Sequence, residues 1–474
     1  MRAPLLLVLL ATACGDPAPP PGPTRVTGEW PVEVELAAGA TPRFERVVLV
    51  TIDTLRADHV SAHGYRRKTT PFLDSLAERG VLFERAQATV SHTAPSHTSM
   101  LTGLPPLVHG VLHNGYRIEE GAVDLARVFA AAGFETAACV NTEFLQGVAA
   151  QFGALSWTIE RGDTVLASAR RWLAEERQTP RFFLWVHLFD PHHWKGFALE
   201  VESERLFRGK APPDWTEYVL ALHGLTPETL IGQRWETEVD RPVEITSLEQ
   251  YLRFVDGYDA LIQYADRQLQ GLYEAVEGLG LAGPTLWIVT SDHGEGLASH
   301  GLHGHGGHIY QEQLAVPLVV HASDGSLGPR RVTALTTHLD LFPTLLEVVG
   351  GRARAPEGLL EGRSLWPLIS GAESDWPGRT LFAQRKPTEE ALYALRDARH
   401  KLLDSATKPD ELYDLEQDPL ELAERSAELA ETRAALAAEL ERRLALYAAS
   451  AQGSEDQEIP EAWLEELRDL GYVR

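Results

Sequence analysis

The sequence has only two cysteines, Cys14 and Cys139, in 474 residues. Acylation of Cys14 would leave Cys139 without an intramolecular partner, which excludes a scaffold held together by disulfides. Basic residues are also scarce, because 43 Lys and Arg stand against 68 Asp and Glu and the net charge is -25. A nucleic-acid binder needs a basic surface to displace counterions, so no nucleic-acid partner is expected.

The apolar run at the N-terminus is too short to span a bilayer as a mature helix. It covers Leu5–Leu10, follows Arg2 and precedes Ala11-Thr12-Ala13-Cys14, a pattern typical of an export signal cut after Ala13. Ordinary secretion and a bacterial lipoprotein signal are the alternatives, and the position of Cys14 before a Pro-rich stretch favours the lipoprotein. We therefore expect a signal peptide at 1–13 and an exported protein of the bacterial cell envelope, attached to the membrane only by lipid on Cys14.

The rest of the composition is typical of a soluble globular protein, with 44% hydrophobic and 23% charged residues. The length predicts a large domain and a smaller one. Residues 15–43 begin with a Pro-rich stretch and are expected to form a tether, with packing of Val32–Leu36 on the domain as the alternative. The charged, poorly periodic span 195–250 is either an insertion that shapes substrate access or a solvated surface excursion.

Buried strands alternate with helices over most of the chain. Continuous apolar runs at 47–52, 182–186, 286–290 and 316–320 predict strands buried on both faces, with another at 136–140. Helices are predicted between Thr70 and Gly80 and over 123–132. This alternation predicts an α/β fold with helices on both faces of a sheet. Short strands at 380–383, 391–396 and 400–403 and a helix over 419–447 predict a smaller C-terminal unit.

Acidic and histidine residues stand just past three of the predicted strands. They are Asp53, Asp292 with His293, and His192. Ligands collect at the carboxyl ends of strands in open α/β sheets, so these residues are expected to converge. Each alone has a simpler explanation, because an Asp after a strand usually belongs to a turn or helix cap.

Thr93 is expected at a helix N-terminus, because Pro95 and Ser96 are typical of a helix start and Gly103 of its end. Unpaired N–H groups and the helix dipole there favour an alkoxide and an incoming oxyanion. The alternative is that Thr93 serves only as the N-cap of that helix.

The segments around these residues resemble the bacterial sulfatases of the alkaline phosphatase superfamily. Thr93-Ala94-Pro95-Ser96-His97 lies where sulfatases carry Cys-x-Pro-Ser-Arg, and the likeness runs in family order from about residue 45 to 430. The other similar stretches are 48–59, 70–74, 190–192, 291–295, 338–346, 362–365 and 411–415.

The resemblance implies a three-layer α/β/α sandwich with a large mixed, mostly parallel sheet over 44–370. It also implies a small C-terminal α+β subdomain over 371–474. Asp53, Asp292 and His293 match metal ligands, and His192 matches a histidine that contacts the transferred group. His305 falls near the substrate-binding lysine of the family. The nearby cluster of His293, His300, His303, His305 and His308 is either a second metal site or a set of loop residues.

Three departures from the sulfatase pattern change the expected chemistry. Thr93 carries a methyl group on Cβ, so oxidation would give a ketone, and no formylglycine is expected. Thr54 stands where sulfatases usually have a second metal-binding Asp, and His97 replaces the motif arginine. Fewer carboxylates and more imidazole favour one manganese or zinc ion, with calcium as an alternative.

The resulting set resembles the sites of lipoteichoic acid synthases and phosphoethanolamine transferases, in which a threonine is the metal-bound nucleophile. We therefore expect Asp53, Thr93, Asp292 and His293 as metal ligands, with Thr93, His97, His192 and His305 as the catalytic set. Metal coordination lowers the pKa of a hydroxyl, and protonated or donating histidines would stabilise developing charge or protonate the leaving group.

The leading hypothesis is a metal-dependent hydrolase that cleaves sulfuric or phosphoric esters of a small molecule, glycan or lipid. One alternative is a transferase that moves a phosphoryl or phosphoalcohol group onto an envelope glycan or lipid, although the multi-span anchor typical of such enzymes is not seen. The other alternative is an inactive sulfatase-fold protein that binds glycans, which would have little need for Asp53, Asp292 and His293.

Overall fold

A computed structural model describes residues 24–27, 30–195, 206–207, 210–235, 243–372, 376–385, 391–452 and 455–456. The predicted signal peptide, Cys14 and the first part of the predicted tether lie outside these residues. None of the helices in the described part of the chain is long and apolar enough to cross a membrane.

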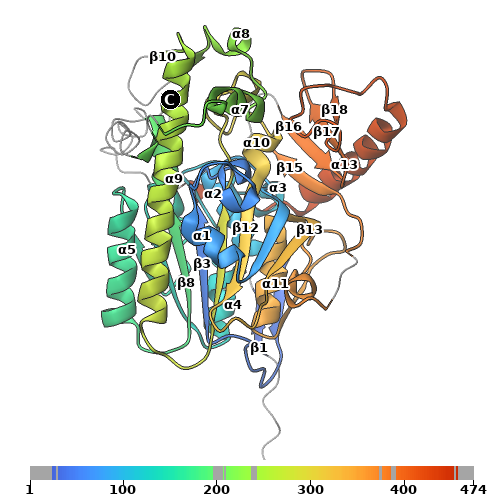
Figure 1. Ribbon diagram of the computed structural model, residues 1–474. Coiled ribbons are helices and arrows are strands. Elements are labelled where there is room, and N and C mark those ends of the chain that lie inside the picture. Colours follow the sequence, from blue (N-terminus) through green and yellow to red (C-terminus); the bar gives the residue numbers. More distant parts are fainter. Residues whose placement is uncertain are drawn as a thin grey trace, which may run out of the picture.

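An eight-stranded sheet forms the centre of the protein, in the order β13-β4-β12-β11-β3-β8-β6-β7 (Figure 1). Only β12 runs antiparallel to its neighbours in this sheet. The strands are β3 (Arg46–Ile52), β4 (Val81–Gln87), β6 (Glu135–Val140), β7 (Ala154–Trp157), β8 (Phe182–Leu188), β11 (Thr285–Ser291), β12 (Ala315–Ala322) and β13 (Arg330–Thr337).

Helices cover both faces of the sheet, and strand β3 shows why. All seven of its residues are buried, with Val47 and Leu49 in one hydrophobic cluster and Val48 and Val50 in the other. One face packs against α2 (Thr93–Thr102), α4 (Leu125–Ala131) and α11 (Leu341–Val348). The other packs against α1 (Pro71–Ala77), α5 (Gly162–Arg171) and α9 (Leu248–Glu277). The predicted three-layer sandwich is confirmed.

The C-terminal subdomain is an antiparallel sheet with a long helix, also as predicted. The sheet has the order β15-β16-β17-β18, and helix α13 (Ala430–Ser450) packs against β16 and β17. Its strands are β15 (Leu381–Gln384), β16 (Leu392–Arg396), β17 (His400–Ser405) and β18 (Glu411–Asp414).

Helix α13 begins at Ala430, not near Pro419 as predicted. Glu421 has φ 55° and is fully buried in an ion pair with Lys401, at an Nζ–Oε1 distance of 2.8 Å. A left-handed residue cannot continue a right-handed helix, so this long-range pair prevents the chain from being helical there.

The predicted tether, residues 15–43, includes residues at its C-terminal side that form strands of the folded domain. Strands β1 (Thr24–Val26) and β2 (Glu33–Leu36) form a three-stranded sheet with β14 (Gly351–Arg354). Val34 and Leu36 belong to the core, so the alternative of packing on the domain is correct for this stretch.

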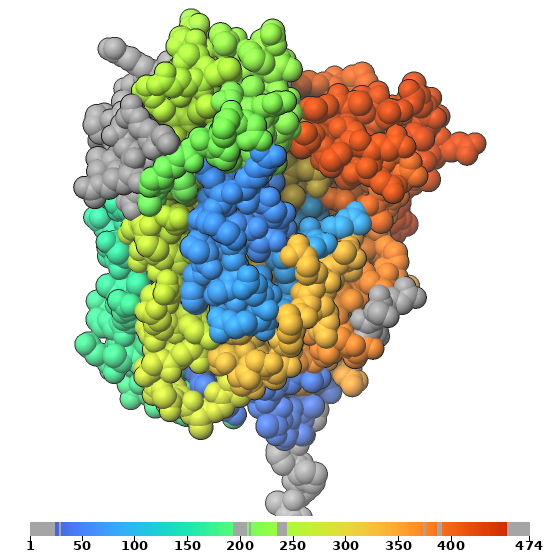
Figure 2. Space-filling view, in the orientation of Figure 1, coloured from blue at the N-terminus to red at the C-terminus, as the bar shows by residue number. Residues whose placement is uncertain are grey.

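The described part of the span 195–250 packs on the large domain. It contains α7 (Trp215–Leu222), α8 (Pro227–Leu230), β9 (Arg234–Trp235) and β10 (Val243–Glu244). Arg67 stacks on Trp215, and the Nε2 atoms of His59 and His223 lie 2.9 Å apart. The segment also reaches the C-terminal subdomain, because the Leu422 side chain lies beside Gly224. Figure 2 shows the green segment against the orange-red subdomain. A purely solvated excursion is therefore wrong for these residues.

Candidate active site

Two neighbouring parallel strands deliver two carboxylates to the same edge of the sheet. The register pairs Ile52 of β3 with Ser291 of β11, so the next residues, Asp53 and Asp292, leave the sheet side by side. His293 follows, and the ligand atoms of Asp53, Asp292 and His293 all lie within 4.8 Å of one another. All three residues are fully buried. The structure therefore brings together the predicted metal ligands of these two strands.

Thr93 is the first residue of α2, and His92 occupies the N-cap position. The helix ends at Gly103, whose φ is 70°. The Thr93 hydroxyl is buried and makes no hydrogen bond to any described residue, while the N–H of Ala94 donates to Oδ1 of Asn114 instead. The hydroxyl of Thr93 is thus not used to cap the helix. Ser96 ties the helix to the carboxylates, because its hydroxyl donates to the carbonyl of Asp292 at 2.7 Å.

Five buried polar atoms at this place have no hydrogen-bond partner within the described chain. They are both carboxylate oxygens of Asp53, Oδ2 of Asp292, Nε2 of His293 and Oγ1 of Thr93. Leaving such atoms unpaired costs about 1–3 kcal/mol each, and more for a charged group. A divalent cation accepts all of these atom types as ligands, so the residues fit a metal ion.

The backbone orients the ligands that face this position. Oδ1 of Asp292 accepts the N–H groups of Thr54 and His293, at 3.1 and 2.9 Å, so its Oδ2 is turned to the site. Nδ1 of His293 lies 2.9 Å from the carbonyl of Gly294 and must donate to it, which leaves Nε2 unprotonated. Thr54 itself has φ 54°, a strained value for a β-branched residue.

The pKa values of the two carboxyls are shifted in opposite directions. Burial, and then the charge of Asp292, raise the pKa of Asp53 well above its usual range. Burial acts in the same direction on Asp292, but the imidazoles of His293, His97 and His187 lower its pKa to about 2. Two close carboxylates in a buried site repel each other, and a cation between them would remove that repulsion.

His192 and His305 lie on one side of this group, together with His293. The ring centroids of His305 are 5.0 Å from His192 and 4.5 Å from His293. Nδ1 of His305 is 3.3 Å from Oε2 of Glu295, and His192 stacks on Phe189 at 4.2 Å. His305 is therefore a neighbour of one predicted metal ligand, and His192 is a neighbour of His305.

Both ring nitrogens of His97 are engaged within the protein. Nδ1 is 2.8 Å from the carbonyl of Thr93, and Nε2 is 3.0 Å from Oγ1 of Thr51. Burial lowers the pKa of His97 to about 3. It contacts the backbone of the candidate nucleophile, and it is buried at 1% exposure.

Sequence reasoning missed three residues behind the site, which are Thr51, Trp185 and His187. Nδ1 of His187 lies 2.9 Å from Oγ1 of Thr51, and its Nε2 lies 3.2 Å from Oδ2 of Asp53. Burial lowers the pKa of His187 to about 4. Thr51 lies within the apolar run of β3 and His187 directly follows the run of β8, but only the pairing of these two strands brings the residues together.

The remaining histidines of the predicted cluster do not form a second metal group. Nδ1 of His300 lies 2.9 Å from Oε1 of Glu312, and its Nε2 lies 3.1 Å from the carbonyl of Glu421. Within the described ranges, Asp53, Asp292 and His293 are the only group of three or more such residues with metal-like spacing.

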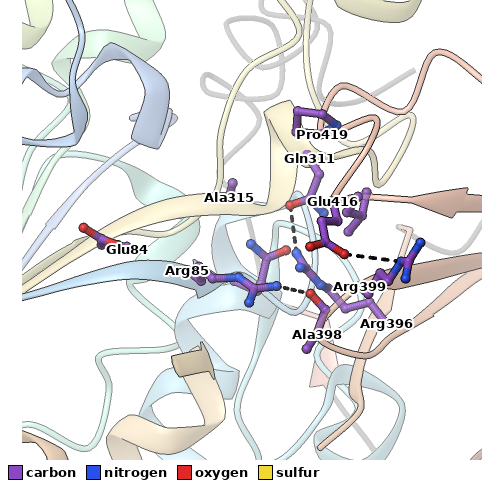
Figure 3. Close-up of a pocket in the computed structure, with 11 residues that line it drawn as sticks. Glu84, Arg85, Gln311, Ala315, Arg396, Ala398, Arg399, Glu416 and Pro419 are labelled. Carbon is purple, nitrogen blue, oxygen red and sulfur yellow. Dashed lines mark hydrogen bonds and ion pairs between the residues drawn. The ribbon is translucent and has the colours of Figure 1, made fainter. Parts of the chain in front are cut away.

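A separate cavity of about 480 Å³ lies between the central sheet and the C-terminal subdomain (Figure 3). Its arginines are already engaged: Arg396 donates to Oε1 of Gln311 at 2.9 Å, and Arg399 pairs with Asp414 at 2.6 Å. None of the candidate site residues lines this cavity. We therefore assign the chemistry to the buried carboxylate cluster and not to this cavity.

Comparison with known proteins connects this geometry to a family. A family model described as Sulfatase matches residues 45–351, and one described as N-sulphoglucosamine sulphohydrolase, C-terminal, matches residues 299–449. The delta 4,5-hexuronate-2-O-sulfatase of Bacteroides thetaiotaomicron is 24% identical over 456 residues, which cover 84% of this chain and 89% of that protein. The arylsulfatase of Clostridium perfringens is 25% identical over 441 residues, covering 79% and 89%.

Solved structures share the fold. The crystal structure of the phosphonate monoester hydrolase of Agrobacterium radiobacter superposes with a TM-score of 0.67 at 22% identity. The superposition covers 86% of this chain and 96% of that one.

Proposed function

Because the chain belongs to the sulfatase family, whose members hydrolyse sulfate or phosphate esters, we propose that it cleaves such an ester with Thr93 as nucleophile and one divalent metal ion. Asp53, Asp292 and His293 would hold the ion, together with the hydroxyl of Thr93. The observation that carries this proposal is the convergence of five buried polar atoms without a partner among the described residues. A glycan-binding protein without activity would have no use for this costly arrangement.

The nucleophile is placed by α2 and by the contacts of its neighbours. Thr93 begins the helix, where backbone N–H groups and the dipole favour the negative charge of an attacking oxygen and of the substrate. When bound, a divalent ion would lower the pKa of the hydroxyl and neutralise charge on the ester. The Thr93 hydroxyl loses its proton to solvent, its Oγ1 forms a bond to sulfur or phosphorus, and the bond from that atom to the leaving alcohol oxygen breaks.

His192 and His305 are the groups proposed to complete the reaction. A proton donated by one of them would neutralise the leaving alkoxide, and the other would stabilise the oxygens of the transferred group. Water then attacks sulfur or phosphorus, releases the inorganic anion and restores the Thr93 hydroxyl. Formylglycine has no place in this scheme, because the Cβ of Thr93 carries a methyl group.

The set of two carboxylates, one imidazole and one hydroxyl favours manganese or zinc over calcium. A sulfated sugar is the substrate class that the relatives support, since one of them is a hexuronate sulfatase. The threonine nucleophile makes a phosphate ester as suitable a substrate, on chemical grounds, as a sulfate ester.

We also propose export and lipid attachment at Cys14, which mass measurement of the mature N-terminus would test.

The direct test is to trap the group on Thr93. Protein turning over an aryl phosphate or aryl sulfate is quenched and digested, and the peptide containing Thr93 is analysed by mass spectrometry. We expect a phospho or sulfo group at Thr93, and none in Thr93→Ala, whose turnover should fall by at least ~10³-fold. Thr98→Ala is the matched control, because this hydroxyl on the same helix only donates to the carbonyl of Ala94. An active Thr93→Ala variant would contradict the proposal.

A further inference from the structure

A chain of hydrogen bonds runs behind the candidate metal site and connects its two sides. It begins at the carbonyl of Thr93, which lies 2.8 Å from Nδ1 of His97. It continues from Nε2 of His97 to Oγ1 of Thr51 at 3.0 Å, and from there to Nδ1 of His187 at 2.9 Å. The hydrogen bonds end at His187, whose Nε2 lies 3.2 Å from Oδ2 of Asp53 without a hydrogen bond to it. The chain thus connects the nucleophile, through the hydroxyl of Thr51, to an imidazole beside a metal ligand.

The donors and acceptors give this chain a direction. The carbonyl of Thr93 can only accept, so Nδ1 of His97 carries a hydrogen. Both hydrogen-bond partners of His97 are neutral groups, and Oδ2 of Asp292 lies 3.9 Å from Nδ1, beyond hydrogen-bond distance. A buried imidazolium without a hydrogen-bonded anion is costly, so His97 is neutral and its Nε2 accepts. The single hydrogen of the Thr51 hydroxyl therefore points to His97.

The hydroxyl oxygen of Thr51 must then accept from its other two neighbours. Trp185 donates its Nε1–H at 3.1 Å, because an indole nitrogen is a donor only. His187 must donate its Nδ1–H, which leaves its Nε2 as a bare lone pair. Nε2 of His187 and Oδ2 of Asp53 are close but not aligned as donor and acceptor, and each is without a hydrogen bond in the described residues. A cation bound beside Asp53 would accept the lone pair of Nε2.

We propose that Thr51 is a positioning residue of the metal site, which fixes His187 with an unprotonated Nε2 toward the cation beside Asp53. The same hydroxyl holds His97 against the carbonyl of Thr93, so it positions the nucleophile as well. His187 thereby adds an imidazole to a site in which Thr54 stands where sulfatases usually have a further metal-binding Asp. This inference rests on the proposed function, because it assumes a cation at Asp53.

Nuclear magnetic resonance of the metal-free protein tests the tautomer directly. The protein is labelled with ¹⁵N-histidine, stripped of metal, and the His187 signals are assigned by their loss in His187→Gln. We expect the Nε2 shift of an unprotonated nitrogen and a change on addition of Zn²⁺. A protonated Nε2 in the metal-free protein, or an Nε2 signal that Zn²⁺ leaves in place while the protein binds the ion, would overturn the inference.

Variants of Thr51 test the role of the hydroxyl. Thr51→Val keeps the shape and removes the hydroxyl, so His187 is free to place its proton on Nε2 and donate to Asp53. We expect Zn²⁺ affinity, measured by competition with a chromophoric chelator, to fall by ~10–100-fold. Thr51→Ser should restore affinity to within a few-fold of wild type. Trp185→Phe is the matched control, because it removes one donor to Thr51 without changing either tautomer.

The outcomes separate this inference from the proposed function. If wild type binds Zn²⁺ tightly and Thr51→Val binds equally well, the positioning role is wrong and the metal site stands. If wild type binds no divalent ion, the proposed function fails, and this inference fails with it.

Discussion

Replacing Asp53 by Asn should stabilise the metal-free protein while it destroys metal binding. Asp53 is fully buried, neither of its carboxylate oxygens has a hydrogen bond in the described structure, and burial and Asp292 raise its pKa. A raised pKa means that the unfolded chain loses its proton first, near pH 4, so stability falls as pH rises from there to the folded pKa. Each unit by which a pKa is raised corresponds to about 1.4 kcal/mol, so Asn, which has no charge to desolvate, should raise the unfolding free energy at pH 7.

The assay is urea unfolding of chelator-treated protein at pH 7, followed by fluorescence. Asp340→Asn is the control, because that buried carboxylate has good partners, among them Nη1 of Arg379 at 2.8 Å. Breaking that pair should cost ~3 kcal/mol. With metal at 100 times its dissociation constant, wild type should gain about 2.7 kcal/mol and Asp53→Asn nothing. A metal-free Asp53→Asn that is less stable than wild type would refute the reasoning.

Three further predictions concern the frame around the site. Burial lowers the pKa of His109 to about 3, so the unfolded chain takes up its proton first and stability falls as pH drops from about 6.5. Urea titrations between pH 6 and 4 give the slope of the unfolding free energy against pH. His109→Gln should reduce this slope by up to ~1.4 kcal/mol per pH unit, and an unchanged slope would contradict the prediction. Lys401→Met should cost ~3 kcal/mol in the same assay, because it leaves Glu421 buried and unpaired, and a neutral effect would show that the pair is not formed. Gly103→Ala should lower the melting temperature and the turnover together, because its Cβ would lie 2.8 Å from Phe342 at φ 70°, and unchanged values would be contrary to this.

The sequence predicted those parts of the fold that depend on local pattern. Strand β3 is a continuous apolar run because it is buried on both faces, and its end at Asp53 could be read directly. The start of α2 at Thr93 followed in the same way from Pro95 and Gly103. At these positions the local sequence preference and the tertiary structure favour the same conformation.

The features that sequence reasoning missed depend on pairing between distant segments. Thr51 and His187 meet because β3 and β8 pair in a particular register, which no local pattern specifies. Glu421 interrupts a sequence that is helical by composition, because Lys401 needs a buried partner. Strand β2 lies in a stretch that looked like part of a tether, and its partner β14 is far away in the chain.

The central claim is a metal-dependent threonine nucleophile, and metal reconstitution tests it most directly. Stripped protein receives manganese, zinc or calcium separately and is assayed with aryl sulfate, aryl phosphate and bis-aryl phosphate, with Thr93→Ala in parallel. We predict ester hydrolysis that requires manganese or zinc and is lost in Thr93→Ala. Hydrolysis that survives in Thr93→Ala, or that proceeds equally well in stripped protein, would contradict the account.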